Sequence, residues 1–259
     1  MSITEDAPAP TARRTAVSRP GPARRLTPWW WLVLISALAL AVAAVGFGTW
    51  WIVSSERQIA TYSVRGSVTA IDLDVGTADV EIVGIAGGPI EVQRTAEFAF
   101  GHPPREARSV PGGVLRITSA CPDSVIGACR TAYRITVRDN VEVTIRTTSG
   151  RVRITDLNGS ARVDTGSGPI AVDGFCGFQL TATSATGSVR GVADCSPDRV
   201  ELRSGSGDVH ASVPVARYRV DASSDGGRAT IRDLVVSDDA SFAVQAISGT
   251  GDVLVDGRQ

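Results

Sequence analysis

The chain has 259 residues, enough for one domain of about 150 to 200 residues with a hydrophobic core. Its 26 basic residues are all arginine, and with 27 acidic residues they give a formal net charge of −1. This balance argues against a large basic field, so we expect no nucleic-acid partner.

Residues 1–28 form a segment rich in Pro, Ala and Arg that is too short to fold alone, and we predict a disordered basic tail. Because positive charge is retained on the inner side of a membrane, the five arginines of this tail place it in the cytoplasm. These are Arg13, Arg14, Arg19, Arg24 and Arg25.

Residues 29–53 contain no charged side chain over about 25 positions, and roughly 20 apolar residues suffice to cross a bilayer. We therefore predict a single transmembrane helix, followed by a linker at residues 54–62. Tryptophans at both ends would lie at the two membrane interfaces. They are Trp29, Trp30, Trp31, Trp50 and Trp51. A cleaved signal peptide is the alternative, although its apolar part is usually about 7 to 15 residues long.

Residues 63–259 contain a repeat built from short runs of Val, Ile, Thr and Ala broken by Gly, Asp and Ser. A glycine recurs at steps of 18, 19, 20, 20 and 24 residues, from Gly150 to Gly251. Three residues before each glycine the side chain is Ser or Thr, and the positions five before, seven before and two after are apolar. The hydroxyl column contains Thr147, Thr165, Ser184, Ser204, Ser224 and Ser248.

This pattern predicts an all-β fold with two short strands in each repeat of about 20 residues. Two strands cannot bury an apolar face alone, so we expect the copies to stack as a parallel β-solenoid. The hydroxyl column is interpreted as turn chemistry, with each glycine adopting positive φ beside it. An antiparallel meander or sandwich is the alternative architecture.

Four cysteines lie on the predicted outer side of the membrane, where disulfides persist. Cys176 and Cys195 each follow a repeat glycine by eight residues, so in a solenoid they lie about 5 Å apart on adjacent rungs. We predict that these two pair and, by elimination, that Cys121 pairs with Cys129. Four unpaired thiols are the alternative.

Residues 83–140 keep strand-like runs but lose the repeat phase, so they form either larger rungs or an insertion. Binding often resides in loops that depart from a regular scaffold. Phe98 to Arg108 and Cys121 to Cys129 are therefore candidate binding segments, and a solenoid cap with a stapled loop is the alternative.

Phrases such as Thr165-Gly166-Ser167-Gly168-Pro169-Ile170 resemble a bacterial family of unknown function whose members are labelled putative adhesins. The resemblance extends over about residues 63–257. It implies a right-handed parallel β-solenoid, often tethered by one N-terminal helix, and in some members a location near envelope-stress systems. It carries over no catalytic residue.

No motif predicts an enzyme, a cofactor or a metal site. His102 and His210 lack the context of a catalytic triad, and His210 falls on an outward strand position. Carboxylates such as Asp164 and Glu201 could align on one face, but the acids alternate with arginines, which favours charge pairing.

We therefore expect a single-pass cell-membrane protein with a cytoplasmic N-terminus and an extracellular C-terminal domain. Its function is adhesion-like, or binding of a protein partner in the cell envelope. The alternatives are a glycan-active β-solenoid enzyme and an envelope-stress regulatory component. The scarcity of aromatic residues in the outer domain lowers the expectation of carbohydrate binding.

Overall fold

The computed structural model describes residues 28–53, 55–99, 102–122 and 129–258. The chain divides into two compact units, Met1–Trp50 and Trp51–Gln259. The predicted disordered tail lies outside the described residues apart from its last position. Most of the described chain is β-strand.

The helix α1 (Pro28–Val53) is apolar along its whole length. Its residues Trp29–Trp50 are long and apolar enough to cross a membrane, a property that an anchor and a signal sequence share. Its hydroxyl groups are satisfied within the helix, since Ser36 donates to the Val33 carbonyl and Thr49 to the Val45 carbonyl, both at 2.9 Å. Internal satisfaction of this kind is what a lipid environment requires of polar groups.

The tryptophans predicted for the membrane interface occupy the two ends of α1. Trp29, Trp30, Trp31 and Trp50 are all at least 59% exposed. The side chain of Trp51 lies outside the described residues.

The second unit consists of two ten-stranded sheets, which we name sheet A and sheet B. In spatial order, sheet A contains β1 (Ser55–Val64), β4 (Ile90–Ala99), β7 (Cys129–Arg138), β3 (Ala78–Ile85), β9 (Val152–Thr155), β11 (Ile170–Phe175), β13 (Val189–Ala193), β15 (Val209–Pro214), β20 (Val253–Arg258) and β17 (Ala229–Arg232). Sheet B contains β18 (Val235–Val236), β16 (Arg217–Ser224), β19 (Phe242–Ser248), β14 (Arg199–Ser204), β12 (Gln179–Ser184), β10 (Ala161–Thr165), β8 (Glu142–Thr147), β2 (Ala70–Asp74), β6 (Val114–Ala120) and β5 (Arg105–Ser109). A short 3₁₀ turn, η1 (Pro111–Gly113), precedes β6.

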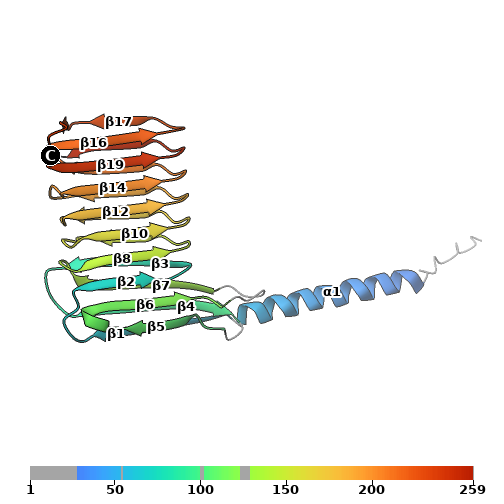
Figure 1. The fold of residues 1–259 in the computed structure, drawn as a ribbon. Coiled ribbons are helices and arrows are strands. Elements are labelled where there is room, and N and C mark those ends of the chain that lie inside the picture. The colour runs from blue at the N-terminus through green and yellow to red at the C-terminus, as the bar shows by residue number, and fades with distance from the viewer. Residues whose placement is uncertain (1–27, 54, 100–101, 123–128, 259) are drawn as a thin grey trace, which may run out of the picture. The chain divides into compact units, whose positions relative to one another are not determined.

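Each rung of the stack is one strand of sheet B followed along the chain by one strand of sheet A (Figure 1). Neighbouring rungs are parallel and in register, for example Val163 beside Ala182 and Ala182 beside Leu202. The predicted β-solenoid with two strands per repeat is confirmed, and the antiparallel meander is wrong for the repeats.

The rungs do not follow chain order at the two ends of the stack. The last rung of the chain, β19/β20, lies between β14/β15 and β16/β17, and Figure 1 shows β19 between β14 and β16. At the other end, β2/β3 lies between β6/β7 and β8/β9. The columns still align, since Ser248 lies beside both Ser204 and Ser224. The rungs share their apolar columns, so they can change neighbours without losing register.

The N-terminal end of the solenoid differs from the sequence prediction. Residues 55–62, predicted as a linker, belong to β1, which pairs antiparallel with β4 over ten residue pairs. The segment 83–140 is a further rung, β6/β7, combined with two antiparallel strands, β4 and β5, that border the stack. Backbone pairing to β4, rather than side-chain pattern, brings β1 into the domain.

The core lies between the two sheets and consists of the predicted apolar columns. Ile145, Val163, Ala182, Leu202 and Ala246 are 0% exposed. Ala222, the equivalent residue of the rung β16/β17, is only half-buried, because the short strand β18 beyond that rung pairs with Arg217 and Tyr218 alone.

Candidate interaction surface

The predicted column of Ser and Thr residues lies inside the turns that join sheet B to sheet A. Ser204 accepts the N–H of Gly207 at 2.7 Å and donates to the carbonyl of Gly187 on the neighbouring rung at 2.8 Å. Ser184, Ser224 and Ser248 repeat this pair of bonds. Thr147 donates to the Gly76 carbonyl, and Thr165 accepts the N–H of Gly168. The hydroxyls therefore join turn to turn, so we assign them a structural role.

The glycines of these turns are needed for a different reason from the one predicted. Of the six repeat glycines only Gly150, at φ +153°, has the expected positive φ. The others lie where the next rung approaches closely: a Cβ added to Gly187 would be 2.1 Å from the carbonyl oxygen of Gly168. Close stacking of rungs, rather than left-handed backbone, therefore excludes a side chain here.

Both predicted cysteine pairs are bonded. Cys176 and Cys195 join adjacent rungs with their Cα atoms 4.8 Å apart, which is the strand spacing. Cys121 and Cys129, with Cα atoms 5.8 Å apart, connect the end of β6 to the start of β7. Residues 123–128 between them lie outside the described residues.

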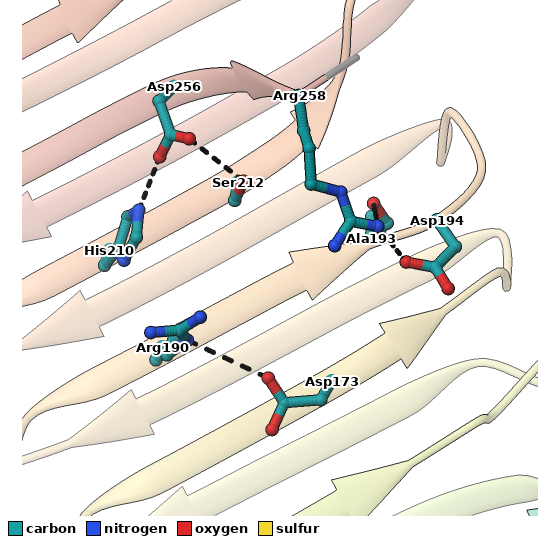
Figure 2. A network of polar contacts seen from close by, with 8 residues as sticks. All are labelled: Asp173, Arg190, Ala193, Asp194, His210, Ser212, Asp256 and Arg258. Atoms are coloured by element: carbon teal, nitrogen blue, oxygen red, sulfur yellow. Dashed lines mark hydrogen bonds and ion pairs between the residues drawn. The ribbon is translucent and has the colours of Figure 1, made fainter.

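The outer face of sheet A carries a network of polar side chains on β11, β13, β15 and β20 (Figure 2). Asp256 accepts hydrogen bonds from Ser212, at 3.1 Å, and pairs with Nε2 of His210. Arg190 lies 3.8 Å from Asp173, and Arg258 pairs with Asp194. His210 is on the outer face, as predicted.

This network does not have the arrangement of a hydrolytic triad. In a triad the histidine lies between the serine and the carboxylate. Figure 2 shows instead that Asp256 lies between Ser212 and His210, so the carboxylate accepts the serine hydroxyl. The imidazole is not positioned to remove the serine proton.

The outer face of sheet B has arginines and acids that neutralise one another. Asp72 binds Arg116 at 3.3 Å and Arg146 at 3.0 Å. The two carboxylates that an enzyme might align are each paired within their own strand, Asp164 with Arg162 at 3.2 Å and Glu201 with Arg203 at 2.7 Å. They lie on β10 and β14 with β12 between them, and in different rows of the register. They form no acid–base pair.

A groove of about 280 Å³ crosses β4, β7, β3 and β9 on the outer face of sheet A. Its lining includes Arg134, Arg151 and Arg153 together with Asp79 and Glu81. An adjoining hollow of about 540 Å³ shares Asp79 and Arg151 and adds Arg130, beside Cys129. We name the two together the basic groove. It borders the Cys121–Cys129 segment that the sequence marked as a candidate binding region.

A charged cluster that the sequence analysis did not identify closes the core at the β1 end of the stack. Arg94 of β4 and Glu106 of β5 pair at 3.0 Å with side chains only 13% and 11% exposed. Tyr133 and Tyr62 donate hydrogen bonds to Glu106 at 3.0 and 3.2 Å. The guanidinium of Arg108 lies 4.2 Å from the centroid of the Tyr62 ring. Repeat folds need polar ends of this kind.

Burial changes the acidity of these tyrosines. Burial, and secondarily the negative charge of Glu106, raises the pKa of Tyr62 to about 12. Burial likewise raises the pKa of Tyr133. Both phenols stay protonated and can go on donating to Glu106 at neutral pH. Within the described residues no group of three or more His, Cys, Asp or Glu side chains is placed to hold a metal ion.

Comparison with known proteins identifies the repeat. Residues 131–251 match the family model described as Toastrack DUF4097. This part of the chain is similar to the Toastrack domain. The matched part begins in β7 and ends in the turn after β19, so it contains the hydroxyl column and the Cys176–Cys195 bond. No curated protein matches the sequence.

Several solved structures are similar to this chain. A putative cell adhesion protein from Clostridium sporogenes is 11% identical, with a TM-score of 0.47, and the match covers 78% of this chain and 100% of the other. A putative adhesin from Bacteroides fragilis is 13% identical, with a TM-score of 0.44, over 78% and 97%. A putative lipid binding protein from Parabacteroides distasonis is 12% identical, with a TM-score of 0.34, over 76% and 96%.

Proposed function

We propose that the protein is a single-pass membrane protein whose extracytoplasmic Toastrack domain acts as a scaffold for adhesion-like or cell-envelope protein contacts. One observation carries the proposal: sheet A presents polar and charged side chains on adjacent, in-register strands, at a fixed spacing of about 4.8 Å. A rigid row of this kind suits recognition of an extended partner surface. The adhesin-like names of similar structures agree with this role.

The proposed topology rests on charge and on redox chemistry. Five arginines precede the apolar helix, whereas Glu56 and Arg57 follow it with no net charge, which favours a cytoplasmic N-terminus. The two disulfides require an oxidising compartment, and so support an extracytoplasmic domain.

Thiol labelling of protein taken from cells, together with protease accessibility, tests this topology. We expect a polyethylene glycol maleimide to leave the denatured, unreduced protein unshifted, and to add four labels after reduction, because both pairs are bonded. Protease added outside spheroplasts should remove a C-terminal tag and spare an N-terminal one. Four labels without reduction, or a protected C-terminal tag, would contradict the topology.

Site-directed photocrosslinking tests the contact surface. A crosslinking amino acid replaces Ala171 on the outer face of sheet A, and in a matched variant Thr144 on the outer face of sheet B; both are half-buried strand positions. We expect discrete protein adducts from position 171 and few from position 144. Equal adduct patterns from the two faces would remove sheet A as the contact surface.

A further inference from the structure

Three arginines of the basic groove have no acidic partner across the described strands and turns. Among the residues that the structure describes, Arg130, Arg151 and Arg153 form no ion pair through their side chains. By contrast, Arg116, Arg146, Arg162 and Arg203 on the outer face of sheet B are all paired. The groove therefore presents positive charge that no acid of the described domain neutralises.

The two acids in the groove are already engaged. Asp79 accepts the backbone N–H of Arg151 at 2.7 Å, and Glu81 lies 3.5 Å from Arg134. Four arginines face two carboxylates, so the lining carries a net charge of +2. An anionic ligand would neutralise the remaining positive charge of the groove.

The register fixes the spacing of the cations. Glu81 of β3 lies beside Arg134 of β7 on one side and Arg153 of β9 on the other. Two strand spacings therefore separate the two arginines, about 10 Å at their Cα atoms. In an extended polyproline II segment every third side chain lies on the same side, and three residues cover about 9 Å at about 3.1 Å per residue. Acidic residues at every third position would match both arginines.

The lining also distinguishes among anionic ligands. Its single aromatic residue, Tyr133, is 1% exposed, so no ring is available to stack on a sugar. Val80 is 2% exposed and Ala132 is half-buried, so no apolar surface is offered to lipid chains. The chain's own residues 1–28 carry five arginines against Glu5 and Asp6 and would be repelled.

We propose that the basic groove binds an extended acidic segment of a partner protein, through Arg134, Arg151 and Arg153. The inference deepens the proposed function, on which it rests, by giving the chemistry of the partner. Contacts between arginine and carboxylate are favourable in such a setting because the guanidinium donates two parallel hydrogen bonds.

Peptide binding to the full chain in neutral detergent micelles tests the proposal. The probe is a fluorescein-labelled peptide with Glu at every third position and Pro between, and the control peptide has Gln for Glu. We expect binding, measured by anisotropy, that is about tenfold weaker or more for the Gln peptide. Binding of the Glu peptide should also disappear near 1 M salt, where the screening length falls to about 3 Å.

Charge-reversal variants locate the binding. R151E/R153E should weaken binding at least about tenfold, while the matched control R217E/R219E should stay within about twofold. Arg217 and Arg219 are exposed on β16 and form no ion pair within the described part of the chain, so the control changes total charge equally. If the charge-reversed variant fails to fold, two milder variants replace it. R151K/R153K keeps the positive charge, and R151Q/R153Q removes it.

The outcomes separate cleanly. Unchanged peptide binding in R151E/R153E, or equal losses of binding in both charge-reversed variants, would refute the assignment of the binding site to the basic groove. Preferential binding of a sulfated polysaccharide or of anionic lipid vesicles would overturn the peptide assignment. These assays need no membrane orientation, so failure of the labelling experiments in cells would contradict the proposed function without affecting the groove.

Discussion

Replacing Gly187 by alanine tests how closely the rungs must stack. The added Cβ would lie 2.1 Å from the carbonyl oxygen and 2.5 Å from the carbonyl carbon of Gly168, both backbone atoms that cannot rotate away. Relief requires the two rungs to separate locally by roughly 1 Å, out of a spacing of about 4.8 Å. The bond from Ile170 N to Ser188 O, now 2.9 Å, would then exceed the hydrogen-bonding range.

The cost follows from these contacts. Overpacking costs about 1–3 kcal/mol, and each weakened inter-rung hydrogen bond contributes about 1 kcal/mol more. We expect the free energy of unfolding to fall by about 3 to 5 kcal/mol. The matched control is Gly87→Ala, where an added Cβ meets nothing within 4 Å and φ is not left-handed. That substitution should stay within about 0.5 kcal/mol of the parent.

Urea unfolding followed by far-ultraviolet circular dichroism measures both variants. All five tryptophans lie between residues 29 and 51, so tryptophan fluorescence would report the helix and not the solenoid. If Gly187→Ala were as stable as Gly87→Ala, the close stacking of turns described above would be refuted.

Three further substitutions test other parts of the solenoid. Ser204→Ala leaves the half-buried N–H of Gly207 without its acceptor and should lower the free energy of unfolding by about 1–3 kcal/mol, measured in urea, whereas Ser204→Thr should cost less because it keeps the hydroxyl. Replacing Cys176 and Cys195 together by serine opens a loop with a sequence separation of 19 residues and should cost about 3 kcal/mol in the same assay; an unchanged midpoint would show that packing alone fixes the two rungs. Because the folded pKa of Tyr62 is raised to about 12, its contribution is present below about pH 10 and is lost as the pH rises through 12. Tyr62→Phe should therefore flatten the decline of stability over that interval, measured by urea unfolding at several pH values, and an identical decline in both proteins would contradict the assignment.

The sequence predicted the repeat because every column has a physical requirement. Apolar residues at Ile145, Val163 and Leu202 must face the core, and the hydroxyl at Ser204 must satisfy the turn of its own rung and that of the next. Equal requirements at equal intervals fix the register of parallel strands. The same logic placed Cys176 beside Cys195.

The order of the rungs was not predictable from these columns. Ser224 and Ser248 meet the same requirements, so the pattern alone cannot decide which of them follows Ser204 in the stack. Chain order is the simplest assumption, and the structure departs from it at both ends. The longest repeat step, 24 residues between Gly227 and Gly251, was the one sign that the last rung returns across another.

The charged pair at the β1 end was missed although the sequence carried a signal for it. Arg94 alternates in phase with Ile90, Val92 and Ala96, so it points inward on a strand whose other inward residues are apolar. A buried arginine needs a carboxylate. Its partner, Glu106, comes from a strand that lies in the other sheet, and nothing in the repeat indicates that contact.

A perfect repeat surface has nearly the same chemistry at every rung, so a partner could bind it at several positions along the stack. A unique binding position therefore requires a place where the repeat is broken. In this solenoid the antiparallel strands, the Cys121–Cys129 bond, the Arg94–Glu106 pair and the basic groove all involve strands near the β1 end. Further along sheet B, β10 and β14 each contain an arginine paired with an acid of the same strand. This uneven distribution of charge gives a physical reason for expecting a partner to recognise the irregular end, and it places the unpaired arginines where recognition can be specific.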